Sequence, residues 1–151
     1  MLAAIRIRGS VKSTPKIRKT LELLNLLRVN HLVLVKQEQA GMLHKAGAYI
    51  TFGEIDEATL ALALEKRGRL AGNERIGAEF LKEKGFKGFG ELAKAVIGGK
   101  TGLEGLGIKP VLRLSPPKKG YERAGIKKSY RVGGALGYRA SDINLLVKRM
   151  V

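Results

Sequence analysis

The chain has 151 residues, and its 29 Lys and Arg against 13 Asp and Glu give a formal net charge of +16 at pH 7. With 44% hydrophobic residues it is too apolar to be compositionally disordered, and it is long enough for one domain with its own core. Cysteine is absent, which excludes disulfides and thiolate chemistry and fits a reducing cytoplasm. The longest apolar runs fall far short of the roughly 20 residues of a membrane-spanning helix, so we expect no membrane partner and no targeting segment.

The positive charge lies at the two ends of the sequence. Residues 1–36, the first basic segment, carry eight basic side chains against one acid, and residues 109–139, the second basic segment, carry nine against one. In residues 37–108, ten basic side chains are balanced by ten acidic ones. Like charges gathered together repel one another and weaken a compact fold, so solubility alone does not account for the pattern. It predicts a polyanionic partner, and nucleic acid is the first candidate.

The first eight residues predict a β-strand. Ile5 and Ile7 share one face, which we expect to be buried, and Arg6 and Arg8 share the other, which we expect to be cationic.

A loop over 9–15 leads to a predicted helix. Thr14 and Pro15 are typical of a helix start, and the helix is expected to run to about Arg28. Its buried stripe is predicted to be Ile17, Leu21, Leu24 and Leu27. Residues 31–35 are almost continuously apolar, as in a strand covered on both faces. A helix between two such strands indicates a β-α-β crossover unit.

The middle of the chain predicts mostly helix. We expect a loop with a short turn at 41–48, an extended segment at 49–52, a helix from its N-cap Asp56 to about Arg67, and helices at 73–84 and 89–97. Gly68, Gly85 and Gly98 are predicted to end these three helices.

The last third predicts one strand and one helix around a long loop. A glycine-rich loop over 102–107 precedes a strand at 111–114, and a basic loop follows over 115–138. Ser141 is expected to cap a terminal helix, whose inward residues are Ile143, Leu146, Val147 and Met150.

Cations open the first predicted helix, where the helix dipole is positive. Lys16, Arg18 and Lys19 are each unfavourable there by roughly 0.3–1 kcal/mol. A phosphate bound at this helix start would offset that penalty. The alternative is a solvated face that is merely basic.

The basic loop combines glycines, cations and tyrosines, a mixture suited to folded RNA. Glycine permits close backbone approach, Arg holds phosphate through two donors, and Tyr121, Tyr130 and Tyr138 offer rings for stacking. The alternative is a flexible linker whose tyrosines pack into the core. Duplex DNA is disfavoured, because no helix-turn-helix, zinc-finger or basic-zipper pattern occurs.

Catalytic and cofactor signals are weak, so we expect no catalytic residue, cofactor, metal or small-molecule substrate. The sequence at 99–101 resembles the end of a P-loop, but Lys94 stands where the first glycine belongs. The glycines of 102–107 are best interpreted as a loop. The rival class, a metal-dependent phosphoesterase, would need the carboxylates of Glu38, Glu54, Asp56 and Glu57.

Several collinear blocks resemble the L30 family of large-subunit ribosomal proteins, called L7 in eukaryotes, in its longer, archaeal form. They are residues 109–122 (KPVLRLSPPKKGYE), 133–139 (GGALGYR), 41–43 (GML) with Lys45, 51–54 (TFGE) and 66–70 (KRGRL). The resemblance implies an α/β sandwich with a ferredoxin-like β-α-β-α-β core, an inserted helical region and a C-terminal helix. Residues 1–53 and 108–151 would form the rRNA-binding core, and 54–107 the charge-balanced insertion.

The resemblance also implies a structural role on the cytoplasmic ribosome, in which the protein binds large-subunit rRNA, lies near 5S rRNA, meets neighbouring ribosomal proteins and supports assembly and translation. A free-standing RNA-binding or chaperone module is the alternative. The residues expected to contact RNA are Arg6, Arg8, Lys12, Lys16, Arg18, Lys19, Arg28, Lys118, Lys119, Tyr121, Arg123, Lys127, Lys128, Tyr130, Arg131 and Arg139.

Overall fold

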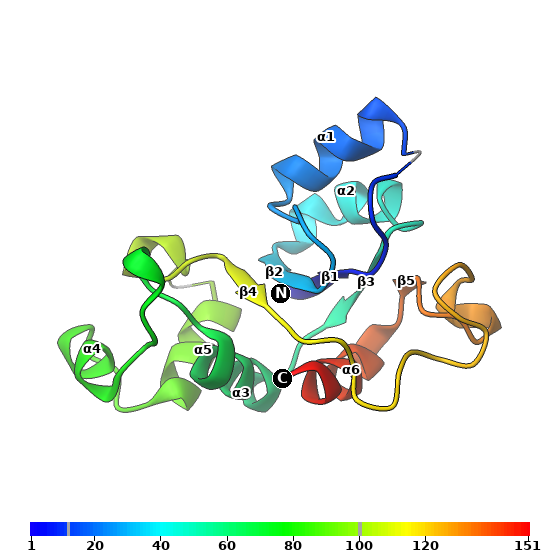
Figure 1. The fold of residues 1–151 in the computed structure, drawn as a ribbon. Helices are drawn as coiled ribbons and strands as arrows, with labels where there is room; N and C mark the ends of the chain where they lie inside the picture. The colour runs from blue at the N-terminus through cyan, green and yellow to red at the C-terminus, as the bar shows by residue number, and fades with distance from the viewer. Residues whose placement is uncertain (12, 100) are drawn as a thin grey trace.

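The computed structural model describes residues 1–11, 13–99 and 101–151 (Figure 1). Its strands are β1 (Leu2–Arg6), β2 (His31–Val35), β3 (Ile50–Glu54), β4 (Val111–Arg113) and β5 (Gly137–Tyr138). Its α-helices are α1 (Pro15–Leu23), α2 (Ala40–Lys45), α3 (Glu57–Arg67), α4 (Ala78–Glu83), α5 (Phe89–Ile97) and α6 (Ile143–Met150). Lys12, one of the predicted RNA contacts, lies outside the described residues. None of the described helices is long and apolar enough to cross a lipid bilayer.

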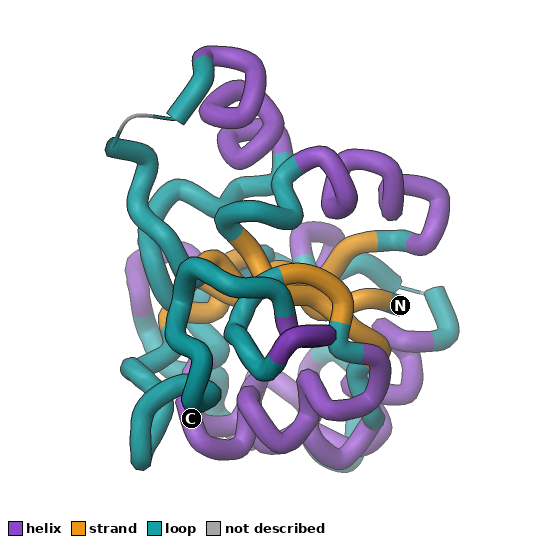
Figure 2. Tube along the Cα trace, turned by 90° about the vertical axis from the view of Figure 1, so that its right-hand side faces the viewer, coloured by secondary structure: helices purple, strands orange, loops and turns teal. Residues whose placement is uncertain are grey.

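A single mixed sheet separates two helical layers. Its strand order is β4-β2-β1-β3-β5, and every neighbouring pair is antiparallel except β3 and β5, which are parallel. The helices α1 and α2 cover one face, whereas α3, α5 and α6 cover the other, so the strands lie between helices in both views (Figures 1 and 2). The predicted α+β class with a β-α-β-α-β core is confirmed.

The central strand β1 is buried on both faces. Leu2 and Ala4 pack with α1 and α2, and Ile5 packs with α3, α5 and α6. The buried face predicted for Ile5 and Ile7 is therefore confirmed. The prediction of a cationic face on this strand is wrong for Arg6, which is only 4% exposed because α1 and α2 cover that side too.

The predicted crossover between β1 and β2 is wrong, because the two strands are antiparallel. The connecting helix α1 ends at Leu23, five residues before the predicted end at Arg28. Asn25 has a left-handed φ of 57°, and the Leu26 amide donates back to the Leu21 carbonyl at 2.8 Å, a common way to close a helix. The chain then turns back along β1.

The early helix end also changes the predicted buried stripe. Leu21 and Leu24 are buried, whereas Leu27 lies beyond the helix and is 60% exposed.

The middle of the chain is helical, with differences in the element bounds. The predicted helices at 56–67 and 89–97 match α3 and α5, but the one at 73–84 shrinks to α4, and α2 forms where a loop was predicted. Gly85, with φ of 79°, follows α4 as expected. Leu60 and Leu92 share one continuous core with Ile5, so the stretch 54–107 packs directly onto the sheet.

The C-terminal part contains one unpredicted strand, β5, which pairs Gly137 with Thr51 at the sheet edge. Ser141 makes no side-chain cap for α6. Asn144 instead links the elements, because its side-chain amide donates to the Ser141 and Glu54 carbonyls and its oxygen accepts from the Asp56 amide, at 2.8–3.0 Å. This residue ties α6 to the start of α3.

Candidate nucleic-acid interface

The second basic segment folds against the first. The Leu114 amide donates to the Asn30 carbonyl at 3.0 Å, and the Tyr121 hydroxyl donates to the Asn30 side-chain oxygen at 3.1 Å. Arg8 and Lys127, one from each segment, line the same cavity. In Figure 1 the chain after β1 and the loop before β5 both lie on the right of the sheet, whereas α4 and α5 lie on the left. The fold thus brings together cations that are a hundred residues apart in sequence.

Backbone hydrogen bonds give the basic loop a defined path. Lys118 and Arg149 exchange two bonds, because the Lys118 amide donates to the Arg149 carbonyl at 2.9 Å and the Arg149 guanidinium donates to the Lys118 carbonyl at 3.1 Å. Further along, the Gly134 amide donates to the Ser129 carbonyl at 2.9 Å. A Cβ on Gly134 would overlap the Lys128 carbonyl, so only glycine fits there. The loop is a hydrogen-bonded structure rather than an extended linker.

A buried ion pair closes the loop onto the sheet. The Arg139 guanidinium forms two hydrogen bonds with the Glu122 carboxylate, at 2.7 and 3.3 Å, and also donates to the Thr51 hydroxyl at 2.8 Å and the Ala135 carbonyl at 2.9 Å. Burial alone would raise the pKa of Glu122, but the hydrogen bond and charge of Arg139 outweigh it and hold that pKa below its usual value. Arg139 is 3% exposed.

Arg6 has a similar internal role. Its guanidinium donates to the carbonyls of Leu26, Leu27 and Arg8 at 2.7–2.9 Å, which fixes the turn between α1 and β2. The structure therefore places Arg6 and Arg139, both predicted to contact RNA, in internal positions. Both side chains are buried and donate their hydrogen bonds to groups of the chain itself.

Tyr121 and Tyr130, two of the three tyrosines predicted to offer rings for stacking, are engaged within the protein. Tyr121 is half-buried, packs against the core and donates to Asn30, and burial raises the pKa of its hydroxyl. Tyr130 donates to the Asp142 carboxylate at 2.6 Å, and the Arg139 guanidinium lies 4.5 Å from its ring centre. The alternative interpretation, tyrosines packed into the core, is correct for Tyr121.

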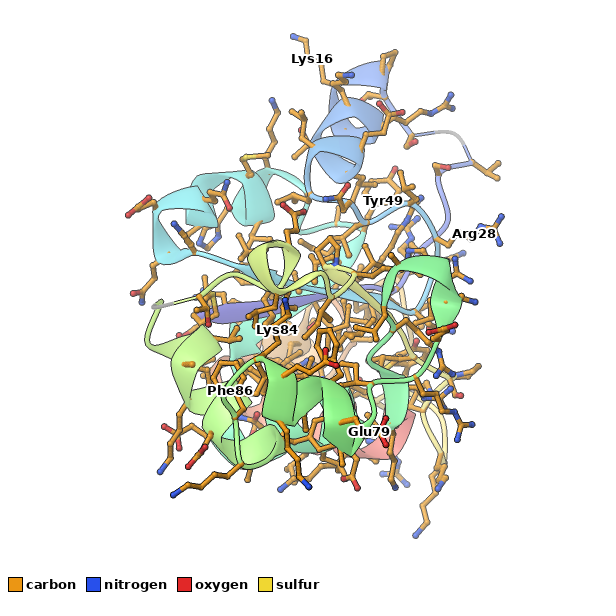
Figure 3. All side chains as sticks on the ribbon, turned by 90° about the vertical axis from the view of Figure 1, so that its left-hand side faces the viewer. Lys16, Arg28, Tyr49, Glu79, Lys84 and Phe86 are labelled. Atoms are coloured by element: carbon orange, nitrogen blue, oxygen red, sulfur yellow. The ribbon has the colours of Figure 1, made fainter. Side chains whose placement is uncertain are left out.

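The remaining predicted cations are solvent-accessible and are called the cationic set below. All are exposed apart from Arg8, which is half-buried: Arg8, Lys16, Arg18, Lys19, Arg28, Lys118, Lys119, Arg123, Lys127, Lys128 and Arg131. Figure 3 shows Lys16 and Arg28 pointing outward from different parts of the first segment.

The α1 cations lie apart from the loop. Within the described ranges, no hydrogen bond or ion pair joins Lys16, Arg18 or Lys19 to residues 109–139. Arg18 instead donates to the Ser13 hydroxyl at 3.0 Å, and Lys19 lies 3.5 Å from Glu22 in an exposed ion pair. Among the described residues, the two segments therefore meet through Arg8, Asn30 and His31 rather than through the α1 cations.

Arg113 on β4 extends the cationic surface beside the start of β2. His31 lies opposite Arg113 in the β2–β4 ladder, close to Arg28. Burial, followed by the charges of Arg113, Arg28 and Arg6, holds the pKa of His31 below its usual value. Arg113 was not among the residues predicted to contact RNA, although its position between the buried Leu112 and Leu114 indicates the exposed face of a strand.

Glu54 and Glu57, two of the four carboxylates that the rival phosphoesterase would need, have partners within the protein, whereas the Asp56 side chain makes no cap hydrogen bond. Glu54 accepts from the Tyr138 hydroxyl at 2.7 Å, Glu57 lies 3.8 Å from Lys94, and Asp56 is the N-cap residue of α3. Residues 1–11, 13–99 and 101–151 contain no cluster of three or more Asp, Glu, His or Cys side chains that could hold a metal ion.

The chain thus combines an α+β fold with many exposed cations, a combination that favours a nucleic-acid partner. The family model of ribosomal protein L30p/L7e matches residues 2–50. The chain is similar to the protein named large ribosomal subunit protein uL30 from Nanoarchaeum equitans. The two are 50% identical over 153 residues, which cover 100% of this chain and 99% of the relative. The proteins of that name from Methanococcus maripaludis and Thermofilum pendens are 46% and 48% identical over 151 residues. They cover 99% and 97% of this chain, and 98% and 96% of the respective relative.

The chain therefore belongs to the uL30 (L30p/L7e) family of large ribosomal subunit proteins, as its sequence blocks predicted. Membership in a ribosomal protein family agrees with the prediction of a structural rather than an enzymatic role.

Proposed function

We propose that this chain is a structural constituent of the large ribosomal subunit that binds large-subunit rRNA, lies near 5S rRNA, and supports subunit assembly and translation. One observation carries the proposal: two basic segments, separated in sequence by a stretch of zero net charge, lie against each other in the folded protein. The names of the relatives, all large ribosomal subunit proteins, support the location on the ribosome.

The proposed contacts are the cationic set, with Arg113 added and with Lys12 retained from the sequence prediction. Lysine and arginine position a protein mainly through phosphates, and structured RNA is recognised largely by shape and by backbone contacts. We propose that the core, 1–53 and 108–151, supplies these contacts. The charge-balanced stretch 54–107 would then be free to meet neighbouring ribosomal proteins.

The test is filter binding of the purified chain to large-subunit rRNA and 5S rRNA transcripts over a range of salt concentrations. The double variant Lys118→Ala, Lys119→Ala should lower the steepness of the log–log salt dependence by about 1.4–1.8, since each phosphate contact contributes about 0.7–0.9. The matched control is Lys82→Ala with Lys87→Ala, two exposed lysines of the charge-balanced stretch, which should leave the slope unchanged. Equal slopes for both double variants would contradict the proposed interface.

Sedimentation separates the ribosomal role from that of a free-standing RNA-binding module. In a sedimentation gradient of native cell extract, a ribosomal constituent travels with the large subunit, whether the cells were harvested from a dense or a dilute culture. A chain that stays in the upper, soluble fractions would contradict the proposal.

A further inference from the structure

A cavity of about 410 Å³ opens where the two basic segments meet, at the β5 edge of the sheet. Arg8 and the end of α2 line one side, the loop residues Lys127 and Ser129 line another, and Phe52 and Tyr138 form part of the wall. It lies within the proposed RNA surface, but neither the charge pattern nor the relatives assign it a ligand.

The sheet explains why this space exists. Phe52 and Tyr138 are register partners on β3 and β5, so their side chains lie on the same face, with ring centres 5.6 Å apart. The short helix α2 covers Phe52, and the His44 ring meets it edge-on at 5.1 Å. Phe52 is 2% exposed whereas Tyr138 is 41% exposed, so the helical layer ends before the sheet does. An aromatic surface is left open to solvent at the edge.

Two cations line the cavity, and contacts within the protein fix the position of one of them, Arg8. The Arg8 guanidinium lies 5.1 Å from the Tyr49 ring centre and donates to the Ala48 carbonyl at 3.1 Å. This fixes its plane while committing one of its five N–H donors. Lys127 comes from the second segment and is exposed. Neither cation is in an ion pair within the described parts of the chain.

One carboxylate, that of Glu54, lies at the hydroxyl end of the Tyr138 ring. Glu54 accepts the Tyr138 hydroxyl at 2.7 Å, so the outer end of that ring carries negative charge. A phosphate is repelled there and is favoured on the side of Arg8 and Lys127.

We propose that this cavity binds the base of one unpaired nucleotide of RNA, stacked against Tyr138, with the adjoining phosphate held by Arg8 and Lys127. The inference rests on the proposed function and deepens it. Proteins recognise single-stranded RNA by stacking splayed-out bases on aromatic rings, and the cavity volume falls in the range of ordinary ligand sites. A base within a duplex is stacked on its neighbours and does not enter.

The experiment compares binding of the full chain to ten-nucleotide uridine and adenosine single strands and to a ten-base-pair RNA duplex. Loss of one base–aromatic stack costs about 1–3 kcal/mol, so Tyr138→Leu should weaken single-strand binding roughly 5- to 150-fold and leave duplex binding unchanged. Tyr138→Phe is the matched control, because it keeps the ring and loses only the hydrogen bond to Glu54. It should bind single strands as the unmodified chain does.

Photocrosslinking uses the unmodified chain, so its result does not depend on whether a variant folds. Single strands that carry 5-iodouridine should crosslink to Tyr138 or His44, as mapped by mass spectrometry of the digested protein. Two results would overturn the cavity assignment and leave the proposed function standing, provided that RNA binding is salt-dependent. One is crosslinks only to residues outside the cavity, and the other is equal single-strand affinity of Tyr138→Leu and the unmodified chain. No binding to any RNA would overturn both.

Discussion

Replacing Glu122 by glutamine removes the countercharge of a buried arginine. The Arg139 side chain is 1% exposed and that of Glu122 20%, so the Arg139 charge has almost no access to water. Removal of one partner from a buried ion pair costs about 3–5 kcal/mol, and because the introduced side-chain amide still accepts one hydrogen bond, we expect a loss of about 2–3 kcal/mol at pH 7. Urea unfolding followed by circular dichroism measures the loss.

Glu57→Gln is the matched control. The Glu57–Lys94 pair spans 3.8 Å with side chains 51% and 69% exposed, and such surface pairs contribute about 0–1 kcal/mol. If Glu122→Gln costs no more than Glu57→Gln, the buried pair does not stabilise the loop as inferred.

The pH dependence supplies a second check on the same pair. The pKa of Glu122 is lower in the folded protein than in the unfolded chain, so the unfolded chain binds a proton first as the pH falls. The stabilisation is therefore fully present above the ordinary glutamate pKa, near 4.3, and is lost as the pH falls through the lower folded value. The stability gap between the unmodified chain and Glu122→Gln should be constant from about pH 8 to pH 6 and should shrink in acid. A stability difference that is as large in strong acid as at neutral pH would refute this reasoning.

Three further predictions concern the loop, α6 and the cationic surface. Gly134→Ala should shift the loop, because its Cβ would overlap a backbone oxygen, and should weaken rRNA binding in filter assays. Gly105→Ala, with nothing within 4 Å of the new Cβ, is its control, and equal binding of the two variants would be evidence against a shaped loop. Asn144→Ala loses the three side-chain hydrogen bonds to Glu54, Asp56 and Ser141 and should cost about 1.5–4 kcal/mol in urea unfolding; an unchanged midpoint would refute the link between α6 and the start of α3. The lowered pKa of His31 should rise when rRNA binds, because phosphates offset the neighbouring arginines, and an NMR titration that shows no rise would place RNA elsewhere.

Short sequence patterns were sufficient to predict those parts of the fold that neighbouring residues in the sequence determine. The apolar alternation around Ile5 predicted a buried face, Pro15 correctly marked the first residue of α1, and the position of Gly85 correctly marked the end of α4. Asn25 ends α1 early because it adopts a left-handed conformation. An asparagine at that position does not require this conformation, so the helix was predicted too long. The two residues of β5 become a strand only because β3 pairs with them, and no local pattern indicates that.

The binding surface was predictable in its charge but not in its detail. Arg6 and Arg139 have the same side chain as Arg28, and only long-range partners, the turn after α1 and Glu122, determine that the first two are buried. The cavity beside Tyr138 could not be predicted from the sequence either, because its aromatic wall depends on the pairing of β3 with β5. Net charge predicted a polyanionic ligand, and tertiary contacts determine which cationic side chains remain exposed.

Crosslinking of protein to RNA on intact large subunits, with each crosslinked residue mapped by mass spectrometry, is the most direct measurement of the shared surface. The account predicts crosslinks to large-subunit rRNA from both basic segments, including residues 8–28 and 118–131, and few from the helices α4 and α5. Crosslinks from only one of the two segments, or concentrated in the charge-balanced stretch 54–107, would contradict it.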